Sequence, residues 1–89
     1  MGTRMKPQQT IMMKLPIKIF ADFNNADGEG RVRLNTSGTL NDLENNNVKL
    51  ETGLEILLDD NDGLTAIGIV QFSETESIWI AIVDWNKLK

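Results

Sequence analysis

The chain contains no cysteine, no histidine and no tyrosine. The absence of cysteine excludes a disulfide framework and thiol chemistry, and it favours a reducing compartment such as the cytoplasm. The absence of histidine removes Ser-His-Asp and Cys-His catalysis together with the commonest general base. Without either residue the usual nitrogen and sulfur ligands of zinc are missing, so we expect no metal site of that kind and no bound cofactor.

Long apolar runs are also missing. No stretch approaches the ~18 consecutive apolar residues that a membrane-spanning helix requires. The beginning of the chain carries positive charge, but it lacks both an uninterrupted apolar region and a small-residue cleavage pattern. We therefore predict a cytoplasmic protein with no secretory signal and no membrane partner.

Positive charge is scarce beyond the first few residues. The formal net charge is −4, although Arg4, Lys6 and Lys14 give residues 1–14 a charge of +3. Subtracting that +3 from the total leaves −7 on residues 15–89. Binding to a phosphate backbone needs clustered lysine or arginine, so this acidic part argues against a nucleic-acid partner. An RNA-binding module is therefore the third of the functions considered.

Motifs for catalysis and ligand binding are lacking as well. The glycines form neither a dinucleotide-binding nor a P-loop pattern, and neither acidic, asparagine-rich loop matches an EF-hand calcium loop. The remaining acid–base candidates are the carboxylates beside apolar runs, Asp22, Glu55 and Asp84. A cleft with paired carboxylates is hard to build in so short a chain. We predict a non-enzymatic protein without catalytic residues, with a small-ligand-binding or carboxylate-based enzyme domain as the alternative.

The chain is rich in β-branched and aliphatic residues, which are concentrated in residues 54–85. Three apolar segments in this region are joined by two polar breaks, at residues 59–63 and 73–76. β-Branched and aromatic residues favour strands, while aspartate, asparagine and glycine favour tight turns. Because consecutive strands usually pair, we predict an antiparallel meander.

Two shorter strands and one helical turn are predicted ahead of this meander. Residues 15–22 alternate loosely, and residues 30–36 alternate cleanly, between apolar and polar side chains. Thr39 followed by Asp42 resembles a capping box, and the three asparagines at 45–47 are suited to ending a helix near residues 39–45.

These elements, with the later strands near 53–59, 65–73 and 76–84, predict an all-β fold. The expected architecture is a small five-stranded SH3-like barrel with one short helical turn, and an OB-like barrel is the alternative. The expected organisation is a flexible or covering N-terminal segment at residues 1–13, followed by a single domain at residues 14–89.

The last strand is apolar on both of its sides, and only one side can face a simple core. Ile80 and its alternate neighbours point one way, whereas Trp79 and its alternate neighbours point the other. We assign the isoleucine side to the interior, which predicts a core of Ile17, Ile19, Val32, Leu34, Leu54, Ile56, Ile67, Ile69, Ile80 and Ile82.

The opposite side then becomes an outer face, provided that strand one lies beside strands four and five. We predict that this face binds a protein partner or, most simply, a second copy of the chain. Its residues are Phe20, Val70, Phe72, Trp79, Ala81 and Val83. A competing cover within the chain is the apolar segment at residues 11–13.

Two segments within residues 15–86 have distinctive arrangements of residues: KIFADFNNADGEGRVRLNTSGTL and GIVQFSETESIWIAIVDW. The first contains D-F-N-N-A-D-x-x-G-R-x-R-L, and the second contains W-x-A-x-x-D-W. In these arrangements the chain resembles small bacterial proteins of the cyanobacterial type. The resemblance implies a bacterial source and an SH3-like β-barrel, and it supplies no activity and no catalytic residues. The leading expectation is a protein-interaction or self-assembly module, with a homodimer as the simplest assembly.

Overall fold

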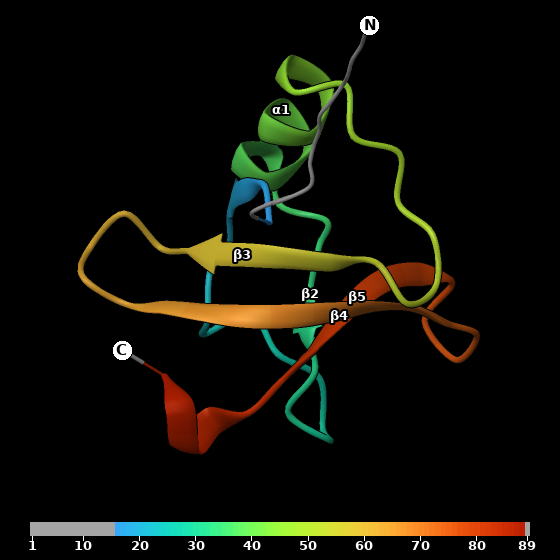
Figure 1. Cartoon of the computed structure of the whole chain (residues 1–89). Helices are drawn as coiled ribbons and strands as arrows, with labels where there is room; N and C mark the ends of the chain where they lie inside the picture. The colour runs from blue at the N-terminus through green and yellow to red at the C-terminus, as the bar shows by residue number, and fades with distance from the viewer. Residues whose placement is uncertain (1–15, 89) are drawn as a thin grey trace, which may run out of the picture.

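The computed structural model describes residues 16–88, which form a curled five-stranded sheet with one short helix (Figure 1). The strands are β1 (Lys18–Phe20), β2 (Val32–Arg33), β3 (Glu55–Asp59), β4 (Thr65–Ser73) and β5 (Ile78–Val83). The helix α1 spans Ser37–Asn45, and a 3-10 turn, η2, spans Trp85–Lys87. The predicted all-β, barrel-like fold is confirmed, with a sheet that curls into half a barrel. The predicted segment 1–13 lies outside the described residues.

The strands follow one another across the sheet in the order β1-β3-β4-β5-β2. The predicted meander is confirmed, because β4 pairs antiparallel with both β3 and β5. β1 instead pairs parallel with β3, and β2 pairs antiparallel with β5. The expected placement of strand one beside strands four and five is therefore wrong. A parallel pair needs a long crossover connection, and the chain between β1 and β3, which includes β2 and α1, supplies it.

The helix begins at Ser37, two residues before the predicted range of 39–45. Thr36 is the N-cap residue, and its hydroxyl accepts a hydrogen bond from the Thr39 amide at 3.3 Å. Thr39, the expected cap, is fully buried, and its hydroxyl donates to the carbonyl oxygen of Phe20 at 2.7 Å. The predicted asparagine ending is confirmed, since Asn46 caps the helix and Asn47 takes a left-handed conformation with φ of 55°.

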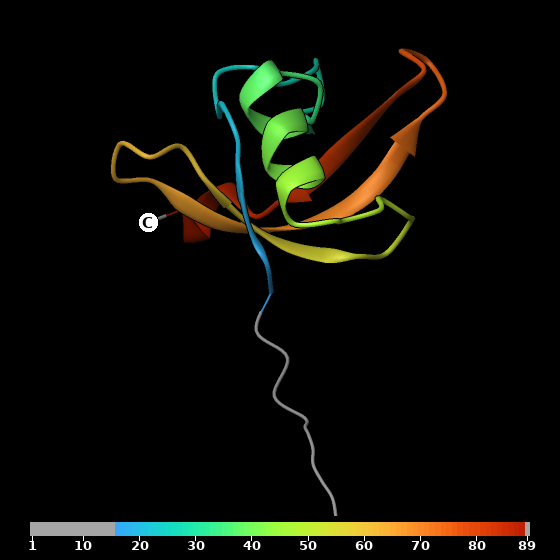
Figure 2. The same ribbon diagram turned by 90° about the horizontal axis from the view of Figure 1, so that it is seen from above.

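The main core lies between α1 and the concave face of the curled sheet (Figure 2). Leu43 of the helix joins side chains from all five strands and from the segment after β1 in one cluster. The buried members of that cluster are Ile19, Ala21, Phe23, Val32, Leu34, Leu43, Ile56, Leu58, Ala66, Val70 and Ala81.

On β4 and β5, the face that points into the core is the opposite of the one predicted. Ile19, Val32, Leu34, Ile56 and Ile80 are buried as expected, and Leu54 packs against the core. The remaining four predicted core residues are not buried: Ile17, Ile67 and Ile82 are exposed and Ile69 is half-buried.

The physical reason is the limited room on the inside of a curled sheet. A methyl group placed on Gly68 would lie 2.9 Å from the Cβ atom of Ala81 and 3.0 Å from the Cδ1 atom of Leu58. β4 and β5 therefore turn their small residues, including Ala66, toward the helix. The isoleucines at alternate positions are left on the convex face.

Two isoleucines of β5 allow a direct test of this orientation. Ile80 is fully buried and Ile82 is 43% exposed. We expect Ile80→Ala to lower the free energy of unfolding by about 2–5 kcal/mol through lost burial and a cavity. Ile82→Ala should cost less than about 1 kcal/mol in the monomer. Thermal or denaturant unfolding at low micromolar protein concentration measures both, and equal losses would contradict the observed orientation.

Candidate functional site

The convex face of the sheet carries a cluster of aliphatic side chains that point away from the core. Leu57 lies between the buried residues Ile56 and Leu58, so its side chain is directed to the other face. Ladder pairing brings Leu57 opposite Ile67 and Ile69 opposite Ile82. We call these four residues, Leu57, Ile67, Ile69 and Ile82, the open patch.

Two members of the open patch are strongly exposed, one on β4 and one on the adjacent strand β5. Ile67 is 45% exposed and Ile82 is 43% exposed, while Leu57 and Ile69 are half-buried. Single exposed aliphatic residues are ordinary on protein surfaces, but paired ones across neighbouring strands form a continuous apolar surface. The arrangement can therefore contact another apolar surface, and it holds no acid–base group of its own.

A hollow of about 350 Å³ lies at one end of the open patch. Its described lining combines Leu57 and Ile67 of the patch with Asp84 and Lys87 from the region after β5. Asp84 caps η2, and its carboxylate accepts a hydrogen bond from the Asn86 amide at 3.0 Å. The hollow thus has an apolar floor with one carboxylate and one ammonium group at its edge.

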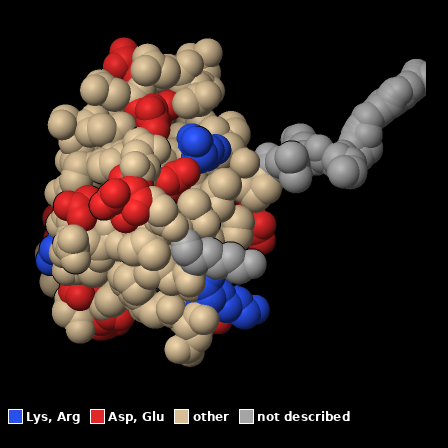
Figure 3. All heavy atoms as spheres, turned by 90° about the vertical axis from the view of Figure 1, so that its left-hand side faces the viewer, with Lys and Arg blue, Asp and Glu red and all other residues tan. Residues whose placement is uncertain are grey.

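Charged groups of both signs surround the patch. Lys18 stands opposite Leu57 across the β1–β3 pair, and its ammonium group lies 3.6 Å from the Asp59 carboxylate. Glu55, at the start of β3, is exposed. Figure 3 views the side of the molecule where the β3–β4 turn lies and shows carboxylates gathered there with lysine or arginine nearby. The rim of the patch is therefore mixed in charge.

The other end of the convex face is occupied by the loop at residues 24–31. Ile80 is fully buried but lies outside the main core cluster. A small cleft where Asp27 and Arg31 meet Ser73 shows that the loop reaches the β4–β5 hairpin. We attribute the burial of Ile80 to this loop, which leaves only the half of the face with the open patch uncovered.

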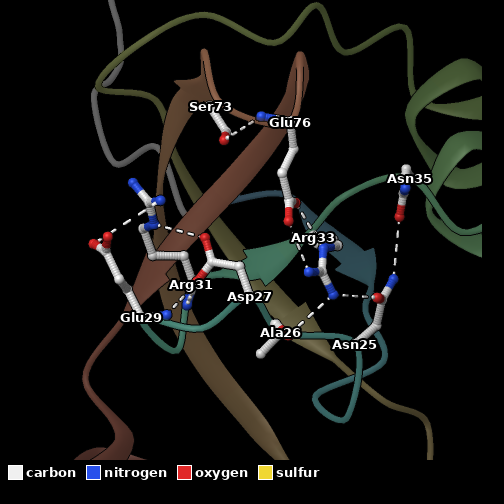
Figure 4. Close-up of polar contacts among 9 residues, drawn as sticks. All are labelled: Asn25, Ala26, Asp27, Glu29, Arg31, Arg33, Asn35, Ser73 and Glu76. Carbon is white, nitrogen blue, oxygen red and sulfur yellow. Dashed lines mark hydrogen bonds and ion pairs between the residues drawn. The ribbon is translucent and has the colours of Figure 1, made fainter.

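Ion pairs hold that loop and the hairpin in place (Figure 4). Arg33 makes two hydrogen bonds with the Glu76 carboxylate, at 2.7 and 2.8 Å. Arg31 donates to Asp27 at 2.8 Å, and the indole NH of Trp85 donates to the Gly30 carbonyl oxygen at 2.8 Å. The Arg33–Glu76 pair thus joins β2 to the β4–β5 hairpin, Trp85 joins η2 to the loop, and the Arg31–Asp27 pair lies within the loop.

The same contacts shift the ionisation of three groups. The guanidinium of Arg33 lowers the pKa of Glu76 through their hydrogen bonds, and Glu76 in turn raises the pKa of Arg33. The backbone amide of Arg31 is the main cause of a lowered pKa for Asp27. A carboxyl whose pKa is lowered by folding stabilises the folded state above its unfolded pKa and loses that contribution as pH falls.

We expect the Glu76–Arg33 pair to give a measurable pH dependence. Glu76→Gln should lower the melting temperature at pH 7 slightly, on the order of a few degrees, because the pair is partly exposed. The difference from the parent protein should shrink as pH falls below the ordinary glutamate pKa of about 4.3. Glu74→Gln is the matched control at an exposed position of the same hairpin. A difference that stays constant from pH 7 to pH 3 would argue against this assignment.

The six residues predicted as an outer contact face do not form an outer face. Val70 and Ala81 are fully buried, and Trp79 and Val83 pack against the core. The side chain of Phe20 lies against Gly38 of α1. Phe72 is 40% exposed at the end of β4 and makes an edge-to-face contact with Trp79, with ring centroids 5.2 Å apart. The prediction placed these residues outside because it assigned the isoleucines to the core.

The carboxylates singled out in the sequence lie on different elements. Asp22 follows β1 and accepts a hydrogen bond from the Asn24 amide, Glu55 begins β3, and Asp84 follows β5. In the acidic turn after β3, Asp59 and Asp60 accept backbone amides of the turn itself. Within residues 16–88, no three histidine, cysteine, aspartate or glutamate side chains are grouped so that they could hold a metal ion.

The open patch was missed because every one of its isoleucines had been assigned to the core. The positions of the small residues, rather than those of the large ones, indicate which face of β4 points into the core. Ala66 and Gly68 alternate with Ile67 and Ile69 along β4. Small residues at every second position mark the crowded, concave side of a curled sheet, which identifies the isoleucine side as convex.

No protein-family model, no curated protein and no solved structure matches this chain. In the described part of the chain, neither helix has the length and apolar character needed to cross a membrane. Arguments about function therefore rest on the residues and their geometry.

Proposed function

We propose that this chain is a protein-interaction module that binds through the open patch. The observation that carries the proposal is the exposure of Ile67 on β4 and of Ile82 on β5. The half-buried Leu57 on β3 and Ile69 on β4 lie opposite them in the sheet. Strands that are apolar on both faces are typical of sheets that are covered by a further layer on each side. The helix covers the concave face, and a bound protein would cover the patch on the convex face.

The energy available is sufficient to make such a contact useful. Burying apolar surface is worth about 25 cal/mol per Å², so roughly 300 Å² from each partner corresponds to about 15 kcal/mol before the costs of association. Those costs, estimated at 4–15 kcal/mol or more, leave a modest net affinity for a patch of this size. A weak or transient interaction is therefore what the patch supports, rather than a permanent complex.

Binding of a small ligand is the second candidate, and the hollow beside the patch favours it. Its volume of about 350 Å³ is near the lower end of the range for small-molecule sites. Asp84 is the one carboxylate among its described lining residues. Carboxylate-based hydrolysis requires a pair, so this observation supports binding rather than catalysis. Protein binding ranks first because two of the patch residues, Ile69 and Ile82, lie beyond the described lining of the hollow.

Site-specific photocrosslinking tests the proposed function without knowledge of the partner. We expect a photoreactive benzoylphenylalanine at position 67 to give covalent protein adducts when intact cells are irradiated. The same group at position 40 should not, because Leu40 is an exposed leucine on α1 away from the patch. Ile82→Glu should remove most of the adducts from position 67, because a charge in the contact opposes its desolvation.

The pattern of adducts decides the outcome. Adducts that form at position 67 and decrease with Ile82→Glu support binding through the patch. Equal adducts from positions 67 and 40, or none from position 67, would contradict the proposed function.

A further inference from the structure

We infer that the open patch binds a second copy of this chain, so that two curled sheets pack face to face. The inference rests on the proposed function and names the partner at the same surface. Two sheets stacked in this way would bury the convex faces as a β-sandwich buries its inner faces, with aliphatic side chains interdigitating. Each copy would then have both faces of its central strands covered.

The chemistry of the patch suits an identical surface. It consists of aliphatic side chains from three neighbouring strands and contains no polar group that would require a specific partner. In a two-fold interface the same surface is used by both subunits. If residue i of one subunit contacts residue j of the other, residue j of the first also contacts residue i of the second. An aliphatic surface satisfies this condition because an identical surface matches it in polarity.

The charge at the rim also suits a second copy. The protein is acidic overall, with a net charge of −4, which would ordinarily oppose self-association. The rim is mixed, however, with Lys18 and Lys87 near Glu55, Asp59 and Asp84. A second copy brings both signs to the contact, so that lysines of one copy can lie near carboxylates of the other. A uniformly acidic or basic partner would meet like charges on part of this rim.

The size of the patch sets the strength that we expect. A standard interface takes about 800 Å² from each partner, whereas exposed apolar patches on monomers commonly measure about 300–600 Å². Self-association through the open patch should therefore be weak and reversible. We expect a dissociation constant between about 10 μM and 1 mM.

Sedimentation equilibrium of the full chain from 10 μM to 1 mM at about 0.15 M salt tests this inference. The parent protein should shift from monomer toward dimer across this range. Ile67→Glu and Ile67→Lys should each weaken the association about tenfold or more. The two variants change the net charge in opposite directions, so a loss in both reports the apolar contact. Leu40→Glu is the matched control, with the same added charge at an exposed leucine on α1, and should change the association less than about twofold.

Several results would overturn the inference. A parent protein that stays monomeric at 1 mM would exclude a second copy, and so would a dimer that both Ile67 variants leave intact. A variant in which Ile11, Met12 and Met13 are all replaced by serine gives a further outcome. If the parent protein is monomeric and this variant dimerises, the N-terminal segment covers the patch instead. Circular dichroism establishes whether each variant is folded. If an Ile67 variant is not folded, Ile82→Lys at the neighbouring position is used in its place.

Failure of this inference can be distinguished from failure of the proposed function. Photocrosslinks from position 67 to a different protein, combined with a monomeric parent, would retain the interaction module and replace its partner. Adducts with the mass of two chains, combined with concentration-dependent dimerisation, would support both.

Discussion

The attachment of α1 to β1 is the contact on which the rest of the structure depends. Phe20 lies in an edge strand, where backbone groups are left without a neighbouring strand. Its amide donates to the Asp42 carboxylate at 2.8 Å, and its carbonyl oxygen accepts from the Thr39 hydroxyl at 2.7 Å. The helix thereby takes the place of a sixth strand along this edge. Gly38 permits the close approach, since a methyl group there would lie 2.7 Å from the Cδ2 atom of Phe20.

This attachment decides which side of the sheet becomes the core. With α1 held against β1, Leu43 joins the buried cluster on the concave face, where Leu58 and Ala81 pack closely around Gly68. The isoleucines of the convex face then depend on other cover. The loop held by the Arg33–Glu76 pair covers one part of the convex face. The part that it leaves uncovered is the open patch. The interaction surface that we propose is thus a consequence of where the helix is attached.

The number of strands and their approximate places along the chain could be predicted from local sequence alone, although β1 and β2 are shorter than predicted. The turn at residues 59–63 and the hairpin at residues 73–78 contain the residues that such turns require, and the three strands around them pair as expected. The start of the helix was misplaced by two residues, because Thr36 and Thr39 can each serve as the N-cap until Phe20 is seen to need a hydrogen-bond donor. Nothing in the local pattern of residues 15–22 shows that β1 pairs with β3.

The sequence by itself determined that β4 and β5 are strands and that both of their faces are apolar. It did not determine which face is buried, because a side-chain period of two residues is the same for either orientation. Curvature and the attachment of the helix settle the orientation, because β4 and β5 can face the concave side only with small residues such as Ala66 and Gly68 where Leu58 and Ala81 pack closely. Ile80 illustrates the distinction: it lies on the convex face with Ile82 but is fully buried, and we attribute its burial to the loop at residues 24–31, which reaches the β4–β5 hairpin. Such a cover depends on contacts such as the Arg33–Glu76 pair, whose members are 43 residues apart in the sequence and meet only once the chain has folded.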